Sequence, residues 1–466
     1  MRIQERLFVS SLCQRKFGTM RLFLMSCLFV LPLFSNAVAA QPDSSARPGD
    51  LVYVTNEDSN TLTVIDPVTN TVKGTVNLTS FDEDPRPPFQ FVTGGVMPGH
   101  AAMTAKPLYH GAIHVHGAAP SPDQTLIAVT GRGSSNVYLI DARGMAVVGN
   151  QPNPRASAQT NSHLLTSGVL VGREPHEPTF SRNGKELWVA LRGEDRIAIL
   201  DAEVAKAVSG GAKENAVRMY LPTLLGPAQA WFSRDGSLAF VISQKVPKIE
   251  VFQTNVGEDG YSRPTRLRTL DISGQDPFGF TPFQKLSSDS EEMWFSHKLA
   301  DAVSSRTIGG EQALVDHIAF GGAARPNHLE FVENRNGKVV YVTFARVDDD
   351  GPNGVASSRI AIIDRSAPPG RRKVVGTFFS HGRESHGIWT NPAHDRLYVA
   401  HEQDELPGTP HAGECVVSVF DVSDPLRPKL ITQIPIGHLD LPSGKLRNKK
   451  SINLIYVRPG SPTHSG

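Results

Sequence analysis

The stretch LVYVTNEDSNTLTVID, residues 51–66, joins two runs of alternating apolar and polar residues through a short polar turn. Such alternation is typical of half-buried β-strands. The same unit, whose second run ends in Asp in most copies, recurs along the chain. The further copies are TLIAVTGRGSSNVYLID (125–141), ELWVALRGEDRIAILD (186–201), SLAFVISQKVPKIEVF (237–252), EMWFSHK (292–298), VVYVTFARV with SRIAIID (339–364) and RLYVAHEQ with VVSVFD (396–421).

Seven such units predict one closed ring rather than several domains. A single four-stranded unit cannot bury both of its faces, whereas a ring of them packs sheet on sheet and leaves few free edges. We therefore predict an all-β fold, a seven-bladed β-propeller of four-stranded antiparallel blades spanning about residues 48–460. The first unit begins at its second strand, so SINLIYVRPG at 451–460 is expected to supply the missing innermost strand and close the ring.

The composition excludes several classes of protein. The 466 residues include 47 Lys and Arg against 46 Asp and Glu, which gives no basic footprint for nucleic acid. The 3 cysteines are too few for a disulfide scaffold or a four-thiolate zinc site, and the absence of a CxxCH motif excludes covalent c-type haem.

The first 40 residues have the pattern of a secretory signal peptide. An apolar run from Leu22 to Phe34 follows Arg21, and small residues then lead to an expected cleavage near Ala39 or Ala40. Translation could start at Met1 or Met20. Cleavage removes five basic residues and one acidic one, so the mature chain is mildly acidic. No second long apolar run follows, so we expect a periplasmic protein without a membrane span.

Four histidines open predicted innermost strands. Alignment of the units on the turn before the second strand puts the following residues in one column: His116, His176, Ala228, Pro282, His328 and His386. The start of the innermost strand faces the mouth of the central channel, and the four histidines fall on one contiguous arc of blades. We predict His116, His176, His328 and His386 as metal ligands. The alternatives are ordinary hydrogen-bonded strand residues and acid/base catalysis without a metal.

Three of these histidines follow an arginine by three residues. Arg173, Arg325 and Arg383 are candidates for binding an anionic ligand or cofactor, although they could instead pair with Glu174, Glu384 and neighbouring carboxylates.

Two inserts carry further candidate ligands. These are Met97, His100, Met103, His110 and His114 in the first and His401, His411 and Cys415 in the second. Imidazole with thioether or thiolate suits copper better than magnesium or calcium. Solvated or packed residues are the alternative, and Cys415 is more simply a buried small apolar residue.

The segment YVTN at 53–56 and its relatives IAVT, LWVA, VYVT and LYVA resemble the YVTN-type periplasmic propellers over nearly the whole mature chain. The histidine column is similar to that of the propeller domain of nitrous oxide reductase, which holds a copper cluster. It is also similar to the haem-d1 domain of nitrite reductase, where a histidine holds the iron and arginines meet haem carboxylates; its last blade resembles residues 397–424. This chain lacks the cysteine-rich dicopper domain and the c-haem domain of those enzymes.

Two functions follow as hypotheses. The first is a propeller whose funnel binds copper or a d1-type haem, with a small anionic ligand and a periplasmic redox protein as partners and redox chemistry if it is an enzyme. The second is a non-catalytic scaffold or assembly factor in which the histidine column is structural.

Overall fold

A computed structural model of the protein describes residues 45–78, 113–149, 168–212, 214–441 and 444–461, and the backbone of short strands at 151–152 and 164–165. All of these residues belong to one compact unit, Ser44–Gly466. The predicted signal peptide at 1–40 lies outside the described residues, as do Met97, His100, Met103 and His110.

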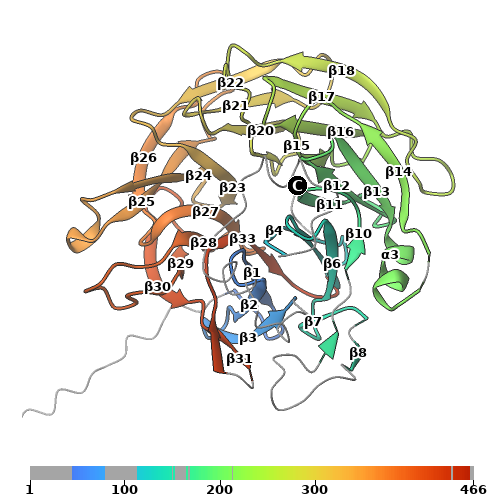
Figure 1. Cartoon of the computed structure of the whole chain (residues 1–466). Coiled ribbons are helices and arrows are strands. Elements are labelled where there is room, and N and C mark those ends of the chain that lie inside the picture. Colours follow the sequence, from blue (N-terminus) through green and yellow to red (C-terminus); the bar gives the residue numbers. More distant parts are fainter. Residues whose placement is uncertain are drawn as a thin grey trace, which may run out of the picture. The chain divides into compact units, whose positions relative to one another are not determined.

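Seven antiparallel sheets confirm the predicted propeller, and Figure 1 shows them arranged around a common axis. From the axis outward, blade 1 consists of β33 (Ser451–Val457), β1 (Leu51–Asn56), β2 (Thr61–Asp66) and β3 (Thr71–Asn77). Blade 2 consists of β4 (Val115–Pro120), β5 (Leu126–Gly131), β6 (Asn136–Asp141) and β10 (Val169–Leu170), and β7 (Ala146–Val147) also pairs with β6. Blade 3 consists of β11 (Pro175–Phe180), β12 (Glu186–Leu191), β13 (Arg196–Asp201) and β14 (Val217–Pro222).

The remaining four blades follow the same order. Blade 4 consists of β15 (Pro227–Phe232), β16 (Leu238–Ser243), β17 (Lys248–Gln253) and β18 (Thr265–Asp271). Blade 5 consists of β19 (Phe283–Leu286), β20 (Glu292–His297), β21 (Ala302–Thr307) and β22 (Leu314–Ala319). Blade 6 consists of β23 (Pro326–Asn334), β24 (Gly337–Asp348), β25 (Ser357–Asp364) and β26 (Val374–Phe379). Blade 7 consists of β27 (Arg383–Thr390), β28 (Arg396–Gln403), β29 (Val416–Asp421) and β30 (Lys429–Pro435).

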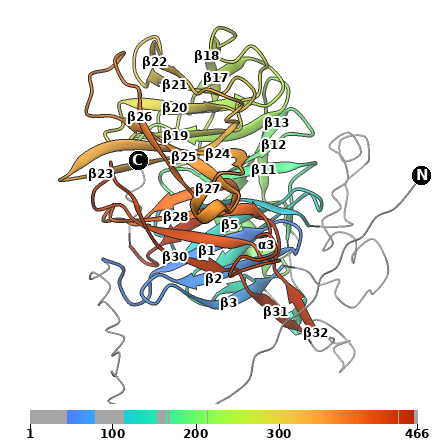
Figure 2. The ribbon, with the colours of Figure 1, turned by 90° about the vertical axis from the view of Figure 1, so that its left-hand side faces the viewer.

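Few described elements lie outside the blades. The helix α3 (Ala202–Ser209) follows β13, and the side chain of Asp201 caps its N-terminus. A short 3₁₀ turn spans Pro352–Gly354. Two hairpins, β8 (Gln151–Pro152) with β9 (Leu164–Leu165) and β31 (His438–Leu441) with β32 (Gly444–Arg447), complete the elements. The second hairpin projects away from the blades in both views (Figure 2).

The turns and the packing explain why the repeats fold this way. In four blades a serine before the second strand accepts a hydrogen bond from the N–H five residues later, as Ser121 does from Leu126 at 3.0 Å. The Asp residues that end third strands accept turn N–H groups, as Asp66 does from Val68. Apolar side chains of neighbouring sheets share cores, so that Tyr53 of blade 1 packs in one cluster with Val129 of blade 2.

The C-terminal strand closes the ring as predicted, since β33 pairs antiparallel with β1. Asp50, just before β1, strengthens this closure because it accepts hydrogen bonds from Arg458 Nε at 2.9 Å and Nη2 at 2.8 Å and from the hydroxyl of Tyr456. Burial favours the neutral acid, but these hydrogen bonds outweigh it and hold the pKa of Asp50 below its usual value.

Replacing Asp50 by Asn should therefore lower the free energy of unfolding at neutral pH by roughly 1.5–3 kcal/mol, the contribution of hydrogen bonds to a charged group. A carboxylate with a depressed pKa stabilises the folded state above its unfolded pKa and loses this effect as the pH falls through the folded value. The gap between wild type and variant should thus narrow below about pH 4. Urea unfolding at pH 7 and pH 3.5 measures this difference in the free energy of unfolding. A difference that is the same at both pH values contradicts the prediction.

Candidate metal centre

Each innermost strand except β19 begins with a bulge, and this bulge places the candidate histidines. In blade 2, Val115 lies opposite Gly131 and Ala118 opposite Val129, so His116 and Gly117 together face one residue, Thr130. The same irregularity puts His176 with Glu177 in blade 3 and His386 with Gly387 in blade 7. Bulges re-aim side chains, and here they occur where the strands enter the channel.

Blade 6 differs from the sequence alignment by one residue. Pro326 lies opposite Phe344 and Leu329 opposite Val342, so Asn327, and not His328, occupies the position of His116. His328 is the next residue, and in the strand register it corresponds to Glu177 of blade 3 and Phe283 of blade 5. The ring of His328 stacks on that of Phe283, with 3.9 Å between the ring centroids. The sequence alignment is shifted here because it places the turn of blade 6 at Glu333, and Glu333 lies inside the longer strand β23.

The four histidines nevertheless lie together on one side of the channel, as predicted. The ring centroids of His176 and His116 are 4.5 Å apart, those of His116 and His386 are 6.3 Å apart, and those of His386 and His328 are 4.6 Å apart. The imidazoles therefore form a continuous row that crosses blades 3, 2, 7 and 6. Blades 4 and 5 contribute Ala228 and Pro282 at the corresponding position.

Threonines of the second strands hold these bulges in place. Thr130 Oγ accepts the Gly117 N–H at 2.9 Å and donates to the carbonyl of His176 in the next blade at 2.6 Å. Thr55 links to the carbonyl of His116 at 2.9 Å, and Thr343 to that of His386 at 2.7 Å. The carbonyl group of each of the three bulge histidines is thus bound by the blade before it. In the sequence these threonines are the last residues of the segments YVT, AVT and YVT.

The hydrogen bonds of His176 define its tautomer. Its Nδ1 lies 2.9 Å from the carbonyl oxygen of Ala228, which can only accept, so the proton is on Nδ1 and Nε2 carries a lone pair. His116 is related to a carboxylate in the same way, with Nδ1 3.3 Å from Glu57 Oε1. The two Nε2 atoms are 3.2 Å apart. That separation is close to the edge of about 3.3 Å of a tetrahedron with metal–nitrogen bonds of about 2.05 Å.

Burial keeps this pair of imidazoles neutral. It lowers the pKa of His116 to about 4, an effect to which the Arg132 guanidinium adds, and lowers the pKa of His176 well below its usual value. Burial also lowers the pKa values of His328 and His386. Neutral imidazole is the form that binds metals.

Glu177 completes a three-residue donor set. One ligand atom from each of His116, His176 and Glu177 lies within 4.8 Å of the other two, and all three residues are buried. Burial raises the pKa of Glu177 to about 8. Its Oε2 packs where a side chain on Gly117 would sit, because a Cβ there would be 2.6 Å away. The column of strand-opening residues did not predict Glu177, which lies one residue inside the strand.

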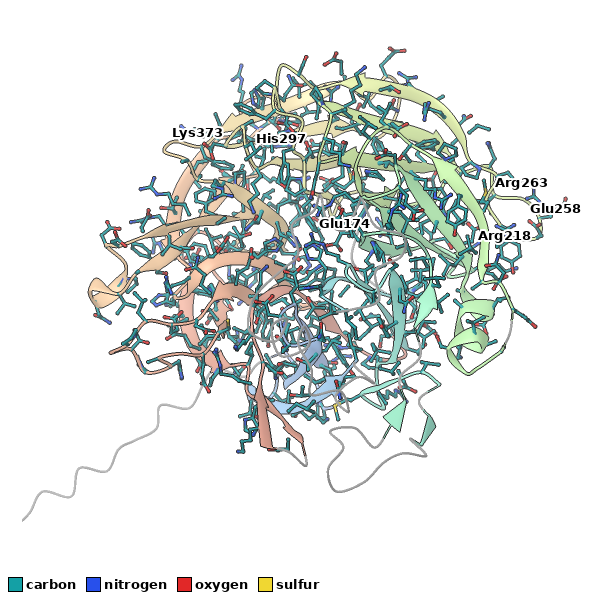
Figure 3. All side chains as sticks on the ribbon, viewed as in Figure 1. Glu174, Arg218, Glu258, Arg263, His297 and Lys373 are labelled. Atoms are coloured by element: carbon teal, nitrogen blue, oxygen red, sulfur yellow. The ribbon has the colours of Figure 1, made fainter. Side chains whose placement is uncertain are left out.

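Charged residues directly after the second strands surround the histidines, and the sequence reasoning missed them. Arg132 Nη1 contacts Glu57 Oε1 at 2.8 Å, Lys450 contacts Glu57 Oε2 at 2.6 Å, and Arg192 Nε contacts Glu174 Oε1 at 2.9 Å. Although burial opposes ionisation, Lys450 and Arg132 hold the pKa of Glu57 well below its usual value. Figure 3 shows Glu174 at the inner side of the ring, far from the outer Arg218 and Arg263.

One aligned column could have revealed these residues, since in blade order it reads Glu57, Arg132, Arg192, Gln244, Lys298, Ala345 and Glu402. In blades 1 to 5 this column is the residue directly after the second strand, and in blades 6 and 7, whose second strands are longer, it lies inside the strand. Lys298 is half-buried, its burial lowers its pKa, and its charge acts on both His328 and His386.

The three arginines predicted to bind an anion do not converge on the histidines. Arg173 Nε lies 3.9 Å from Glu194, and Arg383 donates to the carbonyl of Asp404 at 2.6 Å. Arg325 is exposed. The pairing expected as the alternative is found in part, because Arg173 pairs with the neighbouring carboxylate Glu194. Glu174 instead binds Arg132 and Arg192, and Glu384 accepts from Gln403. A role of Arg173, Arg325 and Arg383 in binding a cofactor stays a prediction.

The candidate ligands of the inserts that the structure describes are not part of the cluster of His116, His176 and Glu177. His401 is fully buried, with Nδ1 2.9 Å from the carbonyl of Val416 and Nε2 3.0 Å from Ser380 Oγ. Cys415 is 1% exposed, contacts Asp404 at 3.1 Å, and burial raises its thiol pKa. His411 lines a different pocket. His114 is buried without a hydrogen-bond partner for its ring among the described residues.

Comparisons with known proteins agree with this fold. No family model matches the sequence, and no curated protein matches it. Among solved structures, hydrazine synthase of Kuenenia stuttgartiensis is 16% identical with a TM-score of 0.51, and the match covers 78% of this chain and 99% of that one. The periplasmic gluconolactonase PpgL of Pseudomonas aeruginosa is 13% identical with a TM-score of 0.50, over 88% and 99%. Dihydro-haem d1 dehydrogenase NirN is 14% identical with a TM-score of 0.45, over 90% and 78%.

The blades and the first two of these likenesses establish the class, a seven-bladed all-β propeller, and at such identities the likenesses establish the fold alone. No helix within the described residues is long and apolar enough to cross a membrane.

Proposed function

We propose that the protein binds one divalent transition-metal ion at the channel mouth through His116 Nε2, His176 Nε2 and the carboxylate of Glu177. The observation that supports this most directly is the 3.2 Å between two imidazole nitrogens whose other nitrogens face a carbonyl and a carboxylate. Such outer contacts orient metal-binding histidines. Three protein ligands leave a coordination position open, as in catalytic sites.

Cu(II) is the ion proposed first. Nitrogen and oxygen donors suit it, and it binds a given site more tightly than the other divalent ions of its row. Cys415 lies in the core, and the cluster of His116, His176 and Glu177 contains no sulfur atom that would favour Cu(I). The bound ion would act as a Lewis acid or redox centre, with Arg132, Arg192 and Lys298 attracting a small anion to the open position. A d1-type haem is less favoured, since the three arginines expected to hold its carboxylates do not converge on the histidines.

The chain offers a competing arrangement that needs no metal. Gln244 Nε2 lies 3.3 Å from His176 Nε2, and Arg132 Nη1 lies 3.4 Å from His116 Nδ1. In that arrangement the proton of His116 sits on Nε2 and points at His176, and the histidine column belongs to a scaffold. A measurement of metal binding therefore distinguishes the proposed metal site from the scaffold.

The test is to strip the purified protein with a chelator and titrate it with Cu(II) and Zn(II). We expect one tightly bound ion per chain and, for Cu(II), an electron paramagnetic resonance spectrum with nitrogen coupling from imidazole. Replacing His176 by Gln should weaken binding at least ~100-fold, whereas replacing the exposed His438 by Ala should leave it unchanged. Absence of stoichiometric binding by the wild type would support the scaffold.

The proposed location is the periplasm. Fusion of residues 1–40 to a reporter that is active only after export tests the predicted signal, and an exported reporter is expected.

A further inference from the structure

The channel has a second mouth, where the innermost strands end. Two pockets open there and share Pro120 and Trp389. The larger, of about 80 Å³, extends inward to Glu177 and Asn453. Its wall is mainly aromatic, and the aromatic side chains are Phe180, Trp231, Phe232, Phe283 and Trp389. An apolar pocket with a few polar groups at one end is the usual form of a small-molecule site.

Two amides form the inner end, and their orientation is fixed by the backbone. Gln229 Oε1 accepts the N–H of Gln284 at 2.9 Å, so its NH₂ group is the free end. Gln229 is 2% exposed, and its NH₂ group is the end that this hydrogen bond leaves for a guest. Asn453 Oδ1 accepts the N–H of Leu454 at 2.8 Å, and its NH₂ group is 3.5 Å from both oxygens of Glu177. Both amides therefore present hydrogen-bond donors.

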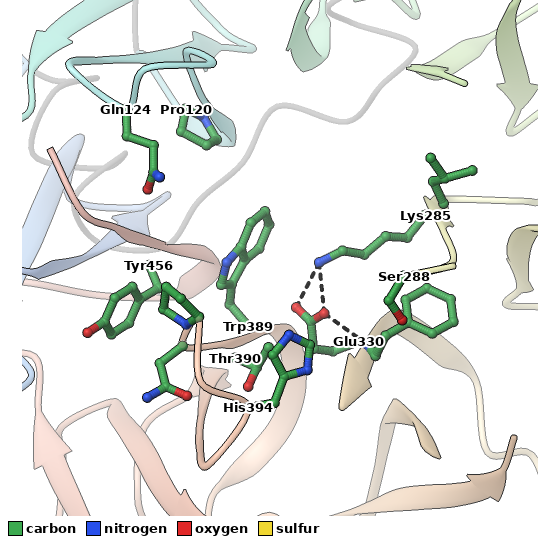
Figure 4. Close-up of a pocket in the computed structure, with 13 residues that line it drawn as sticks. Pro120, Gln124, Lys285, Ser288, Glu330, Trp389, Thr390, His394 and Tyr456 are labelled. Atoms are coloured by element: carbon green, nitrogen blue, oxygen red, sulfur yellow. Dashed lines mark hydrogen bonds and ion pairs between the residues drawn. The ribbon is translucent and has the colours of Figure 1, made fainter. Parts of the chain in front are cut away.

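In the smaller pocket, of about 60 Å³, the charges of Lys285 and Glu330 neutralise each other (Figure 4). Lys285 Nζ donates to both carboxylate oxygens of Glu330, at 2.9 and 2.7 Å, and lies 3.9 Å from the ring centroid of Trp389. At the rim of the larger pocket, Arg182 binds the carbonyls of Ser233 and Phe232 through Nε and Nη2. Arg182 is thus a cation at the outer rim of the larger pocket, and Glu177 is a carboxyl group at its inner end.

We propose that this mouth binds a small molecule with one aromatic ring and a carboxylate or carbonyl oxygen, the ring against the aromatic wall and the oxygen at the NH₂ groups of Gln229 and Asn453. The donors select an acceptor oxygen, because a ligand without one leaves a buried NH₂ group unpaired. The pocket meets the proposed metal centre at Glu177, whose oxygens lie 3.5 Å from the Asn453 NH₂ group, so the two sites adjoin but use different groups to bind their ligands.

The test uses benzoate and benzylammonium, which share a ring and differ in the polar end. Ligand-observed NMR titration in the presence of EDTA should show that benzoate binds and that benzylammonium does not. Gln229→Glu keeps the acceptor for Gln284 N–H but replaces the donor by an oxygen, and should weaken benzoate at least tenfold. Gln275→Glu is the matched control, since it adds the same charge outside the pocket and keeps the acceptor for Arg306. Trp231→Leu, which removes part of the wall, should also weaken benzoate.

The proposal is overturned if wild type does not bind benzoate, if it binds the two probes equally, or if Gln229→Glu retains wild-type affinity. Because EDTA is present throughout, failure here leaves the metal proposal standing, and failure of the metal titration leaves this one standing.

Discussion

Glu330→Leu is expected to lower the free energy of unfolding by about 3–5 kcal/mol, the cost of breaking a buried ion pair. The Lys285 and Glu330 side chains are 4% and 3% exposed, and the pair joins β19 of blade 5 to β23 of blade 6. Removing the carboxylate leaves the Lys285 ammonium buried against the face of Trp389 without its counter-ion (Figure 4). The backbone N–H of Phe331, which donates to Glu330 Oε1 at 2.8 Å, also loses its acceptor.

The double variant Lys285→Met, Glu330→Leu separates the pair from its surroundings. Replacing a buried ion pair by apolar residues of similar volume is often neutral or stabilising, so the double variant should recover most of the loss. Urea unfolding of the wild type, both single variants and the double variant gives the coupling energy. Asp259→Leu breaks the exposed pair with Arg263 and should leave the unfolding midpoint unchanged. If the double variant is as unstable as Glu330→Leu alone, the unpaired charge is not the cause.

The fold was predictable from the repeat because the turns and the alternation of apolar residues in each blade depend on residues close together in the sequence. The Ser-x-Asp turns and the terminal Asp of the third strands make the short-range hydrogen bonds that their residue types predict. Closure by 451–460 was predictable for a similar reason, because the first unit lacked an innermost strand and the chain end supplied one with the right alternation. The strand β33 pairs with β1 over its whole length, with one register shift at Asn56.

The site was predictable only in part, because its contacts cross between blades. The arc of histidines followed from their column, but the residues that tune them come from elsewhere in the sequence. Glu57 reaches His116, and Gln244 reaches His176, from different blades. Arg173 and Arg383, which are close to the histidines in sequence, contact Glu194 and the carbonyl of Asp404. Arg132 and Arg192, which follow second strands, instead contact Glu57 and Glu174 beside the histidines. A one-residue shift in blade 6, caused by the longer β23, was invisible without the pairing register.

Gly117→Ala is the variant expected to weaken the proposed metal centre most without replacing any of its three ligands. An added Cβ would lie 2.4 Å from the carbonyl oxygen of His176, 2.6 Å from Glu177 Oε2 and 2.8 Å from Pro178 Cδ. Two of these three atoms belong to backbone or to a rigid ring, so β11 must move away from β4. That movement displaces two of the three proposed ligands and breaks the hydrogen bond from Thr130 to His176.

We expect Gly117→Ala to weaken Cu(II) binding by ~100-fold, the upper range for loss of outer contacts at metal sites, and to cost about 1–3 kcal/mol of stability from overpacking. Gly309→Ala is the matched control, because nothing lies within 4 Å of its added Cβ and its backbone conformation is not restricted to glycine. Chelator competition measures the affinities and urea unfolding the stabilities. A Gly117→Ala protein that is destabilised yet binds Cu(II) as the wild type does would place the metal away from His176 and Glu177, since the clash acts on those two residues directly.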